Sequence, residues 1–205
     1  SSGIVVVTSS NNLIGADLID PARSADTLKP RNIISGNGLY GVLIVGQEKT
    51  GGSYKNVMAR NYIGTTEDGL GRAPNSSDGV FLLNTLDTAV GGWTRSDGNV
   101  ISGNNGQGVR IFGEWARGNR VSSNFIGLNK DGALVDLGNS ANGVILEQVA
   151  AGAGETNQIL GNTISGNAQS GVMVTSTLGS PTGVEIQGNT IGLTAAGDSA
   201  APNRG

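Results

Sequence analysis

The sequence of 205 residues contains no cysteine and no histidine. Without cysteine the chain has no disulfide bond, no thiolate zinc site and no thiol nucleophile. Without histidine it lacks the commonest general base and the commonest metal ligand, and a Ser-His-Asp triad is excluded. These two absences remove several large classes of enzyme and leave no obvious catalytic group.

Charged and aromatic residues are also scarce. Charged residues make up 14% of the chain and aromatic residues 4%, whereas an average domain is about 25% charged. The net charge is −3 and the 13 Lys and Arg residues are scattered, so no nucleic-acid partner is expected. The longest purely aliphatic run, Ile4–Val7, is far shorter than the ~20 residues of a membrane-spanning helix, so no such segment is expected.

Glycine is abundant, at 35 residues, and it belongs to two short signatures that alternate along the chain. The first is Asn-x-Ile followed alternately by Ser or Gly. The second is Gly followed by a strand-like segment with aliphatic residues at its first and third positions. This segment begins at Ile4, Val42, Val80, Val109, Val144 and Val172. Alternation with β-branched residues predicts strands with one buried face.

A weaker third strand precedes some of the asparagines, around Met58, Val121, Ile159 and Ile186. The segment Asn12-Leu13-Ile14 is assigned to the same strand of the first coil. Regular recurrence of three short strands predicts an all-β fold, a right-handed parallel β-helix of about six coils. We expect residues 1–205 to form a single domain that is a segment of a longer repeat protein.

The asparagine signature predicts a ladder at one turn of the coil, in which each side-chain amide bonds to the next at the ~4.8 Å strand spacing. The alternative is that these residues only form turns. The ladder residues are Asn32, Asn61, Asn99, Asn124, Asn162 and Asn189.

Every second coil carries a longer loop on the same side, which follows the Asn-x-Ile-Gly signature. Loops on a rigid scaffold are a common place for function. Asp68 and Asp131 occupy matching places in two of these loops and are weak candidates for calcium. Two carboxylates do not supply the six or more oxygens that calcium requires, so Asp-Gly turns are favoured and no cofactor is expected.

Outward positions of the Gly-Val strands are mostly apolar, which predicts that loops, a missing part of the protein or a partner cover them. These outward residues are Val5, Val7, Leu43, Val45, Phe81, Leu83, Phe112, Ile145 and Met173. The expected partners are neighbouring coils of a parent protein or other copies of this chain.

Trp93 and Trp115 follow the Gly-Val strands of consecutive coils, and Arg110 and Glu114 lie near Trp115 in the sequence. Exposed tryptophan stacks on sugar rings, so these four residues are the candidate ligand-binding residues, with polysaccharide as the candidate ligand. The alternative is that the tryptophans pack over the apolar positions. Arg110 is the candidate catalytic base if the chain is a lyase, although a surface ion pair with a glutamate is the simpler role.

The segment NVISGNNGQGVRI from Asn99 resembles the parallel β-helix repeat of the pectin-lyase-like superfamily, and so do RNIISGNGLYGVLI from Arg31 and NTISGNAQSGVMV from Asn162. The resemblance covers essentially the whole chain and implies the fold. It does not imply one activity, because the superfamily includes lyases, hydrolases, epimerases, tailspikes and non-catalytic surface proteins.

Three functions remain open. The favoured one is a non-catalytic structural or adhesive module of an extracellular or cell-surface protein, which binds glycans or partners through its loops. The second is a fragment of a polysaccharide-active enzyme of the lyase or epimerase type. The third is a filament subunit that stacks through its open coil ends.

Overall fold

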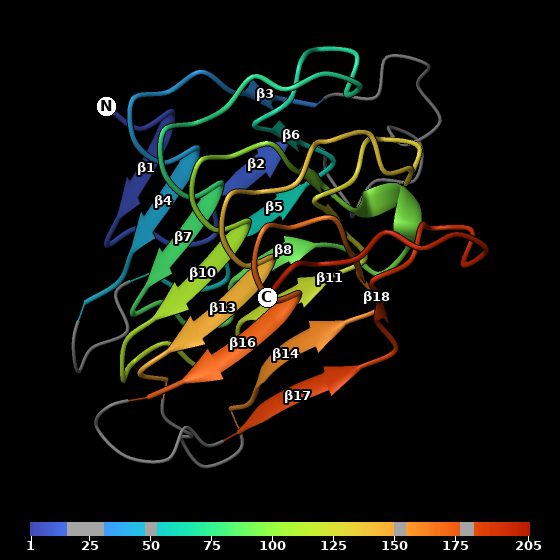
Figure 1. The fold of residues 1–205 in the computed structure, drawn as a ribbon. Helices are drawn as coiled ribbons and strands as arrows, with labels where there is room; N and C mark the ends of the chain where they lie inside the picture. The colour runs from blue at the N-terminus through green and yellow to red at the C-terminus, as the bar shows by residue number, and fades with distance from the viewer. Residues whose placement is uncertain (16–30, 48–52, 150–154, 177–182) are drawn as a thin grey trace.

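The computed structural model describes residues 1–15, 31–47, 53–149, 155–176 and 183–205. They form three parallel sheets of six strands each (Figure 1). Successive strands of the chain enter sheets A, B and C in turn, so each set of three strands makes one coil. This confirms the predicted parallel β-helix of six coils with three strands per coil.

Sheet A contains the Gly-Val strands, β1 (Ile4–Val7), β4 (Val42–Val45), β7 (Val80–Leu83), β10 (Val109–Phe112), β13 (Val144–Glu147) and β16 (Val172–Thr175). Sheet B contains β2 (Leu13–Gly15), β5 (Val57–Ala59), β8 (Ala89–Gly91), β11 (Arg120–Ser122), β14 (Asn157–Leu160) and β17 (Val184–Gln187). Sheet C contains the asparagine-signature strands, β3 (Ile33–Ile34), β6 (Tyr62–Ile63), β9 (Val100–Ile101), β12 (Phe125–Ile126), β15 (Thr163–Ile164) and β18 (Thr190–Ile191).

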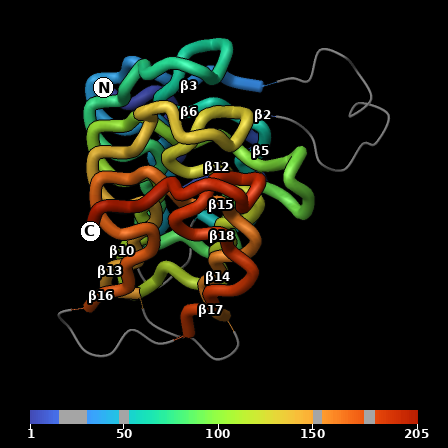
Figure 2. Tube along the Cα trace, turned by 45° about the vertical axis from the view of Figure 1, so that its right-hand side comes forward, coloured from blue at the N-terminus to red at the C-terminus, as the bar shows by residue number. Residues whose placement is uncertain are grey.

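The core is a stack of equivalent aliphatic side chains. In sheet A, Val42, Val80, Val109 and Val144 pair in register and are fully buried. In sheet C the equivalent isoleucines also pair in register, from Ile34 to Ile191, and all but the exposed Ile191 are buried. The first and third positions of the Gly-Val strands therefore point inward as predicted, and the coils lie one upon another (Figure 2).

The alternation of Ser and Gly after the isoleucine has a structural cause. The Ser102 hydroxyl donates to the Leu128 carbonyl oxygen at 2.7 Å and accepts from the Gly127 amide at 3.0 Å. Gly127 has φ +89°, which favours glycine. Ser35 and Ser165 make the same two bonds to the following coil. Each Ser coil is thereby bonded to the Gly coil that follows it.

The predicted asparagine ladder runs through all six coils at the corner between sheets B and C. Each Nδ2 group donates to the Oδ1 atom of the next asparagine, over 2.9 to 3.0 Å, from Asn32 to Asn189. Most Nδ2 groups also donate to a backbone carbonyl, such as that of Val90 from Asn124. The side chains thus satisfy buried backbone groups besides one another.

Two further ladders were not predicted. One lies at the corner between sheets C and A and consists of Asn37, Asn75, Asn104, Asn139, Asn167 and Asn203. The other lies between sheets A and B, where Asn12 bonds to Asn56 and Asn119 to Asn157. In the intervening coil Thr88 takes the place of the asparagine, and its amide and the Thr85 hydroxyl both donate to Asn119 Oδ1. Asparagine therefore shapes all three corners, not one.

The sequence identified most of sheet B and missed β8. Asn12-Leu13-Ile14 does belong to the sheet B strand of the first coil, as Ile14 pairs with Met58. In the third coil Val90 takes this place, but a short helical turn, η1 (Arg95–Asp97), lies between it and Asn99. The insertion breaks the three-residue spacing that marks the other strands.

The long loops of the second, fourth and sixth coils stack on one another outside the helix. The Lys130 amide donates to the Gly69 carbonyl oxygen and the Ala195 amide to that of Gly132, over 3.1 and 2.9 Å. The first and third loops are closed by the antiparallel bridges Thr65–Arg72 and Leu193–Ala200. The repeated insertions thus form a continuous wall beside sheet C.

Candidate functional site: a cationic pocket on sheet C

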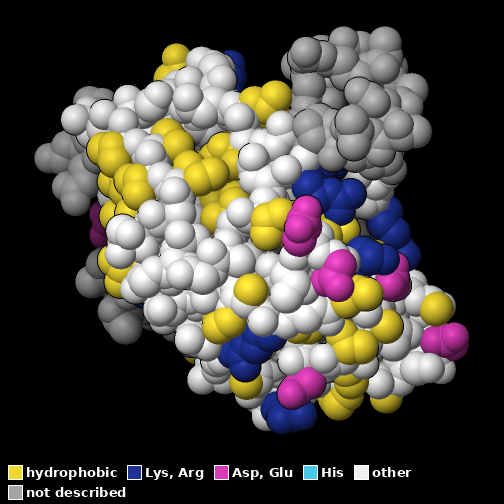
Figure 3. Space-filling model, turned by 90° about the horizontal axis from the view of Figure 1, so that it is seen from above, with side chains coloured by type: hydrophobic (Ala, Val, Ile, Leu, Met, Phe, Trp, Pro, Cys, Tyr) yellow, Lys and Arg dark blue, Asp and Glu magenta, His cyan; other side chains and the backbone are white. Residues whose placement is uncertain are grey.

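A pocket of about 210 Å³ opens on the outer side of sheet C. Four successive coils each contribute one cation to its lining: Arg31, Arg60, Arg95 and Lys130. Tyr62 and Phe125, which point outward from β6 and β12, form its aromatic part. In the space-filling view, Lys and Arg side chains gather in groups with Asp and Glu side chains beside them (Figure 3).

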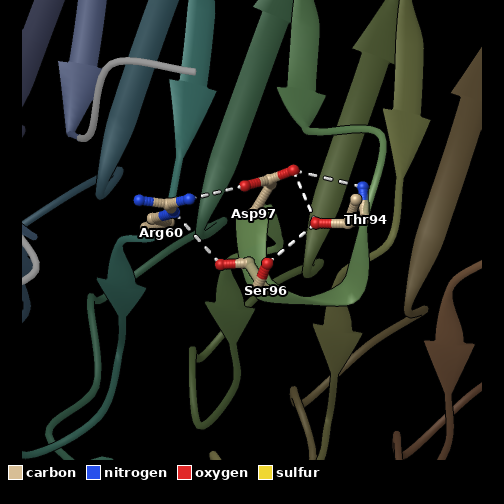
Figure 4. Close-up of polar contacts among 4 residues, drawn as sticks. All are labelled: Arg60, Thr94, Ser96 and Asp97. Atoms are coloured by element: carbon tan, nitrogen blue, oxygen red, sulfur yellow. Dashed lines mark hydrogen bonds and ion pairs between the residues drawn. The ribbon is translucent and has the colours of Figure 1, made fainter. Parts of the chain in front are cut away.

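Arg60 is held by the residues of η1 (Figure 4). Its Nη2 atom donates to Asp97 Oδ1 at 2.8 Å, and its Nε atom to the Ser96 carbonyl oxygen at 3.1 Å. The other carboxylate oxygen of Asp97 accepts from the Thr94 hydroxyl and amide. Burial raises the pKa of Asp97, but the hydrogen bonds from Thr94 and Arg60 outweigh it and lower the pKa overall. This network fixes the turn that carries Arg95.

Two of the four cations have no anionic partner among the residues that the structure describes. The guanidinium carbon of Arg31 lies 4.4 Å from the centroid of the Tyr62 ring, and that of Arg95 lies 5.6 Å from the Phe125 ring. Arg95 also donates to the Ala195 carbonyl oxygen at 3.3 Å. Within the described part of the chain, neither arginine forms a salt bridge. Both side chains are exposed.

Lys130 borders the pocket from the second long loop. Its ammonium group lies 2.7 Å from Asp131 Oδ1, and this hydrogen bond raises the pKa of the lysine. A second hollow shares Arg95, Phe125 and Lys130 with the first and extends to Ala195 and Ala196. The hollowed surface therefore continues along sheet C beyond the pocket itself.

The structure places Arg110, the candidate base, in the middle of the outer face of sheet A. Its Nε atom lies 2.5 Å from Glu147 Oε2, and its guanidinium carbon lies 5.0 Å from the Phe81 ring and 5.3 Å from the Phe112 ring. The glutamate partner comes from the next coil and is not Glu114, whose exposed side chain lies after the strand. Arg110 is thus engaged in a structural contact.

The two tryptophans lie at opposite ends of the strands of sheet B. Trp115 precedes β11 and its ring faces Arg117, at 4.9 Å. Trp93 follows β8, is 80% exposed and faces Arg120, at 3.8 Å. Burial lowers the pKa of Arg120. Each tryptophan therefore pairs with an arginine at a different corner of the coil.

Asp68 and Asp131 lie in the turns of the stacked loops. The Asp68 carboxylate accepts from the Thr66 hydroxyl and the Leu70 amide, and these bonds lower its pKa. Asp131 pairs with Lys130. In the part of the chain that the structure describes, no three His, Cys, Asp or Glu side chains are close enough to hold a metal ion. Both residues have contacts typical of turns.

The apolar outer positions of sheet A differ in exposure along the helix. Val5 and Val7 are 53% and 54% exposed and Met173 is 41% exposed. Between the strands that carry them, Phe81 on β7 contacts Tyr40 with ring centroids 5.2 Å apart, and Ile145 on β13 is buried. The apolar outer positions are therefore partly buried or buried between the two ends and more exposed on β1 and β16.

Sequence reasoning missed the cationic pocket, although part of it carries a signal. Arg31 and Arg60 each precede a ladder asparagine directly, so they occupy equivalent outward positions in neighbouring coils. Arg95 belongs to η1 and Lys130 to a long loop. Arg95 and Lys130 lie in insertions outside the repeat, so their positions in the sequence do not indicate that they line the pocket.

Comparisons with protein-family models, with curated proteins and with solved structures find no match to this chain. Among the described residues, no helix is both long enough and apolar enough to cross a membrane.

Proposed function

We propose that this chain is a non-catalytic structural module of an extracellular or cell-surface β-helix protein, which holds binding loops in fixed positions. The observation that carries the proposal is the continuous bonding between coils, in which an asparagine ladder joins all six coils at each of two corners. Such one-dimensional stacking makes a rigid rod whose loops keep constant spacing.

The contacts of the candidate catalytic residue support the same proposal. Arg110 is paired with Glu147 and flanked by two aromatic rings. A guanidinium already bonded to a carboxylate and flanked by rings is not free to contact a substrate. Arg110 and Glu147 instead join neighbouring coils across sheet A.

The decisive experiment measures turnover and stability on the same protein. The chain is incubated with pectin and with alginate, and the absorbance of unsaturated product is recorded for the wild type and for Arg110→Ala. We expect no product from either protein and a lower melting temperature for the variant. Product formed by the wild type and lost in the variant would show a polysaccharide lyase and contradict the proposal.

The filament alternative is tested by light scattering over a concentration series. A structural module that works within one chain keeps a constant mass. Mass that grows with concentration without reaching a limit would favour a self-assembling subunit, because open-ended stacking has no closed size.

A further inference from the structure

We propose that the cationic pocket on sheet C binds a phosphate monoester dianion, carried on a small molecule or on a sugar unit of a polymer. The proposal rests on the side chains that line this pocket and is independent of the structural role of the coils. The ligand is identified by charge, by the geometry of the donors and by the size of the site.

The charge of the pocket favours a dianion. Four cations line it, and two of them are neutralised within the protein, Arg60 by Asp97 and Lys130 by Asp131. Arg31 and Arg95 form no ion pair within the described ranges, which leaves two positive charges in the pocket of a chain whose net charge is −3. A phosphate monoester carries a charge of about −1.5 to −2 at neutral pH, and so matches this pair better than a carboxylate or a sulfate ester does.

The aromatic rings hold the two free arginines in place before a ligand arrives. Arg31 lies over Tyr62 and Arg95 over Phe125. A guanidinium over a ring still has N–H donors along its edges, which can bond two oxygens of a phosphate. Because rotation of these side chains is already restricted, less conformational entropy is lost on binding.

The hydroxyl groups and the size of the pocket are consistent with such a ligand. Ser96 and Ser123 also line it, and a hydroxyl can donate a hydrogen bond to a phosphate oxygen. The volume of about 210 Å³ admits a phosphate group together with a small ring. The adjoining hollow that shares Arg95 and Lys130 leaves space for the remainder of a larger ligand.

The test is calorimetric titration at low salt with phenyl phosphate and with phenyl sulfate, which have the same ring but different charge. We expect one site per chain and, at about pH 7.5, at least tenfold tighter binding of the phosphate. Lowering the pH to about 5.5 protonates the phosphate, whose second pKa is about 6, so the preference should shrink. Equal affinity for the two esters, or no saturable binding of phenyl phosphate, would overturn the proposal.

Three variants locate the site. Arg31→Gln and Arg95→Gln should each weaken phenyl phosphate binding about tenfold, since each removes charged hydrogen bonds. Arg204→Gln is the matched control, because Arg204 is exposed and does not line the pocket. Thermal unfolding verifies that all three variants fold. A similar loss in Arg204→Gln would show that only overall charge matters and would refute a site.

Titration with inorganic phosphate and with glucose 6-phosphate distinguishes the sources of the group. Tighter binding of the sugar phosphate, reduced in both pocket variants, would support a ligand in which the ring contributes. Tighter binding of inorganic phosphate would support a free anion as the ligand. Failure of both to bind would contradict the proposal and leave the structural function of the coils intact.

Discussion

At the scale of single residues, asparagine side chains stabilise the corners of this β-helix through hydrogen bonds. Its amide can donate to the next asparagine and to a backbone carbonyl at once, as Asn124 does toward Asn162 and Val90. Its Oδ1 atom accepts from the amide and the side chain of Asn99. One side chain thus satisfies several buried groups that water cannot reach.

Replacing Asn124 with alanine should therefore lower the free energy of unfolding by about 2–4 kcal/mol, because it leaves buried donors and acceptors without partners. Denaturant unfolding followed by circular dichroism measures the effect. Asn189→Ala is the matched control at the end of the same ladder, where the side chain is only half-buried. Equal losses at the two positions would show that the turn, and not the ladder, determines the cost.

Asp78 is a buried carboxylate on which the effect of burial outweighs that of hydrogen bonding. It is 5% exposed and accepts a hydrogen bond from the Gln107 amide at 2.8 Å. Burial raises its pKa, and the bond from Gln107 and the charge of Arg110 offset this only in part. The ionised form is therefore less favourable in the folded than in the unfolded chain.

Because the folded-state pKa of Asp78 is raised, the folded chain binds its proton more tightly, and stability falls as the pH rises from the unfolded toward the folded pKa. Asp78→Asn keeps an acceptor without the charge. We expect the variant to gain stability relative to the wild type as the pH rises from about 3.5 to 7, measured by thermal unfolding. A difference that is independent of pH would contradict this assignment.

At the scale of elements, close contact between coils decides where glycine is required. Gly127 and Gly192 occupy the same place in the repeat, with φ +89° and +83°. A Cβ atom at Gly127 would lie 2.2 Å from the Ser165 carbonyl oxygen of the next coil, whereas at Gly192 no atom lies within 4 Å. The backbone is the same, and only the neighbouring coil differs.

This pair separates backbone strain from packing. Gly192→Ala should lower the free energy of unfolding by about 1–2 kcal/mol, because alanine is disfavoured in a left-handed backbone conformation. Gly127→Ala should cost that amount and about 1–3 kcal/mol more for the overlap. Urea unfolding of both variants measures the difference. Equal destabilisation would mean that the coils separate easily enough to accept a methyl group.

At the scale of the whole molecule, a β-helix is a linear array in which each coil contacts only its neighbours. The strands β7 and β10 of the central coils have partners on both sides, whereas β1 and β16 have a partner on one side within this chain. The inward residues of the end strands, such as Ile4 and Val172, are only partly buried. Local stability should therefore decrease from the middle toward each end.

Amide hydrogen exchange measures this gradient. We expect the amides of Val80–Leu83 and Val109–Phe112 to exchange at least tenfold more slowly than those of Ile4–Val7 and Val172–Thr175, since opening an end coil breaks contacts on one side only. Uniform protection along the chain would show that the six coils unfold as one unit.

The sequence by itself determined the repeat, because the buried side of a coil tolerates few residue types and these recur at every turn. It predicted the strands of sheet A, most strands of sheet B and one complete asparagine ladder. It did not predict β8, because η1 lengthens the segment between this strand and Asn99. It did not predict the other ladders, because the long loops of alternate coils place residues such as Asn75 and Asn139 at irregular intervals in the sequence.

Only the tertiary structure decided which outward side chains lie together. Arg31, Arg60, Arg95 and Lys130 are far apart in the sequence and meet on sheet C, whereas Trp93 and Trp115 belong to consecutive coils and lie at different corners. The buried positions recur at every coil, so their pattern is visible in the sequence. The contacts of outward side chains depend on where the loops and insertions place them once the coils have stacked. That placement follows no repeat and is visible only in the folded chain.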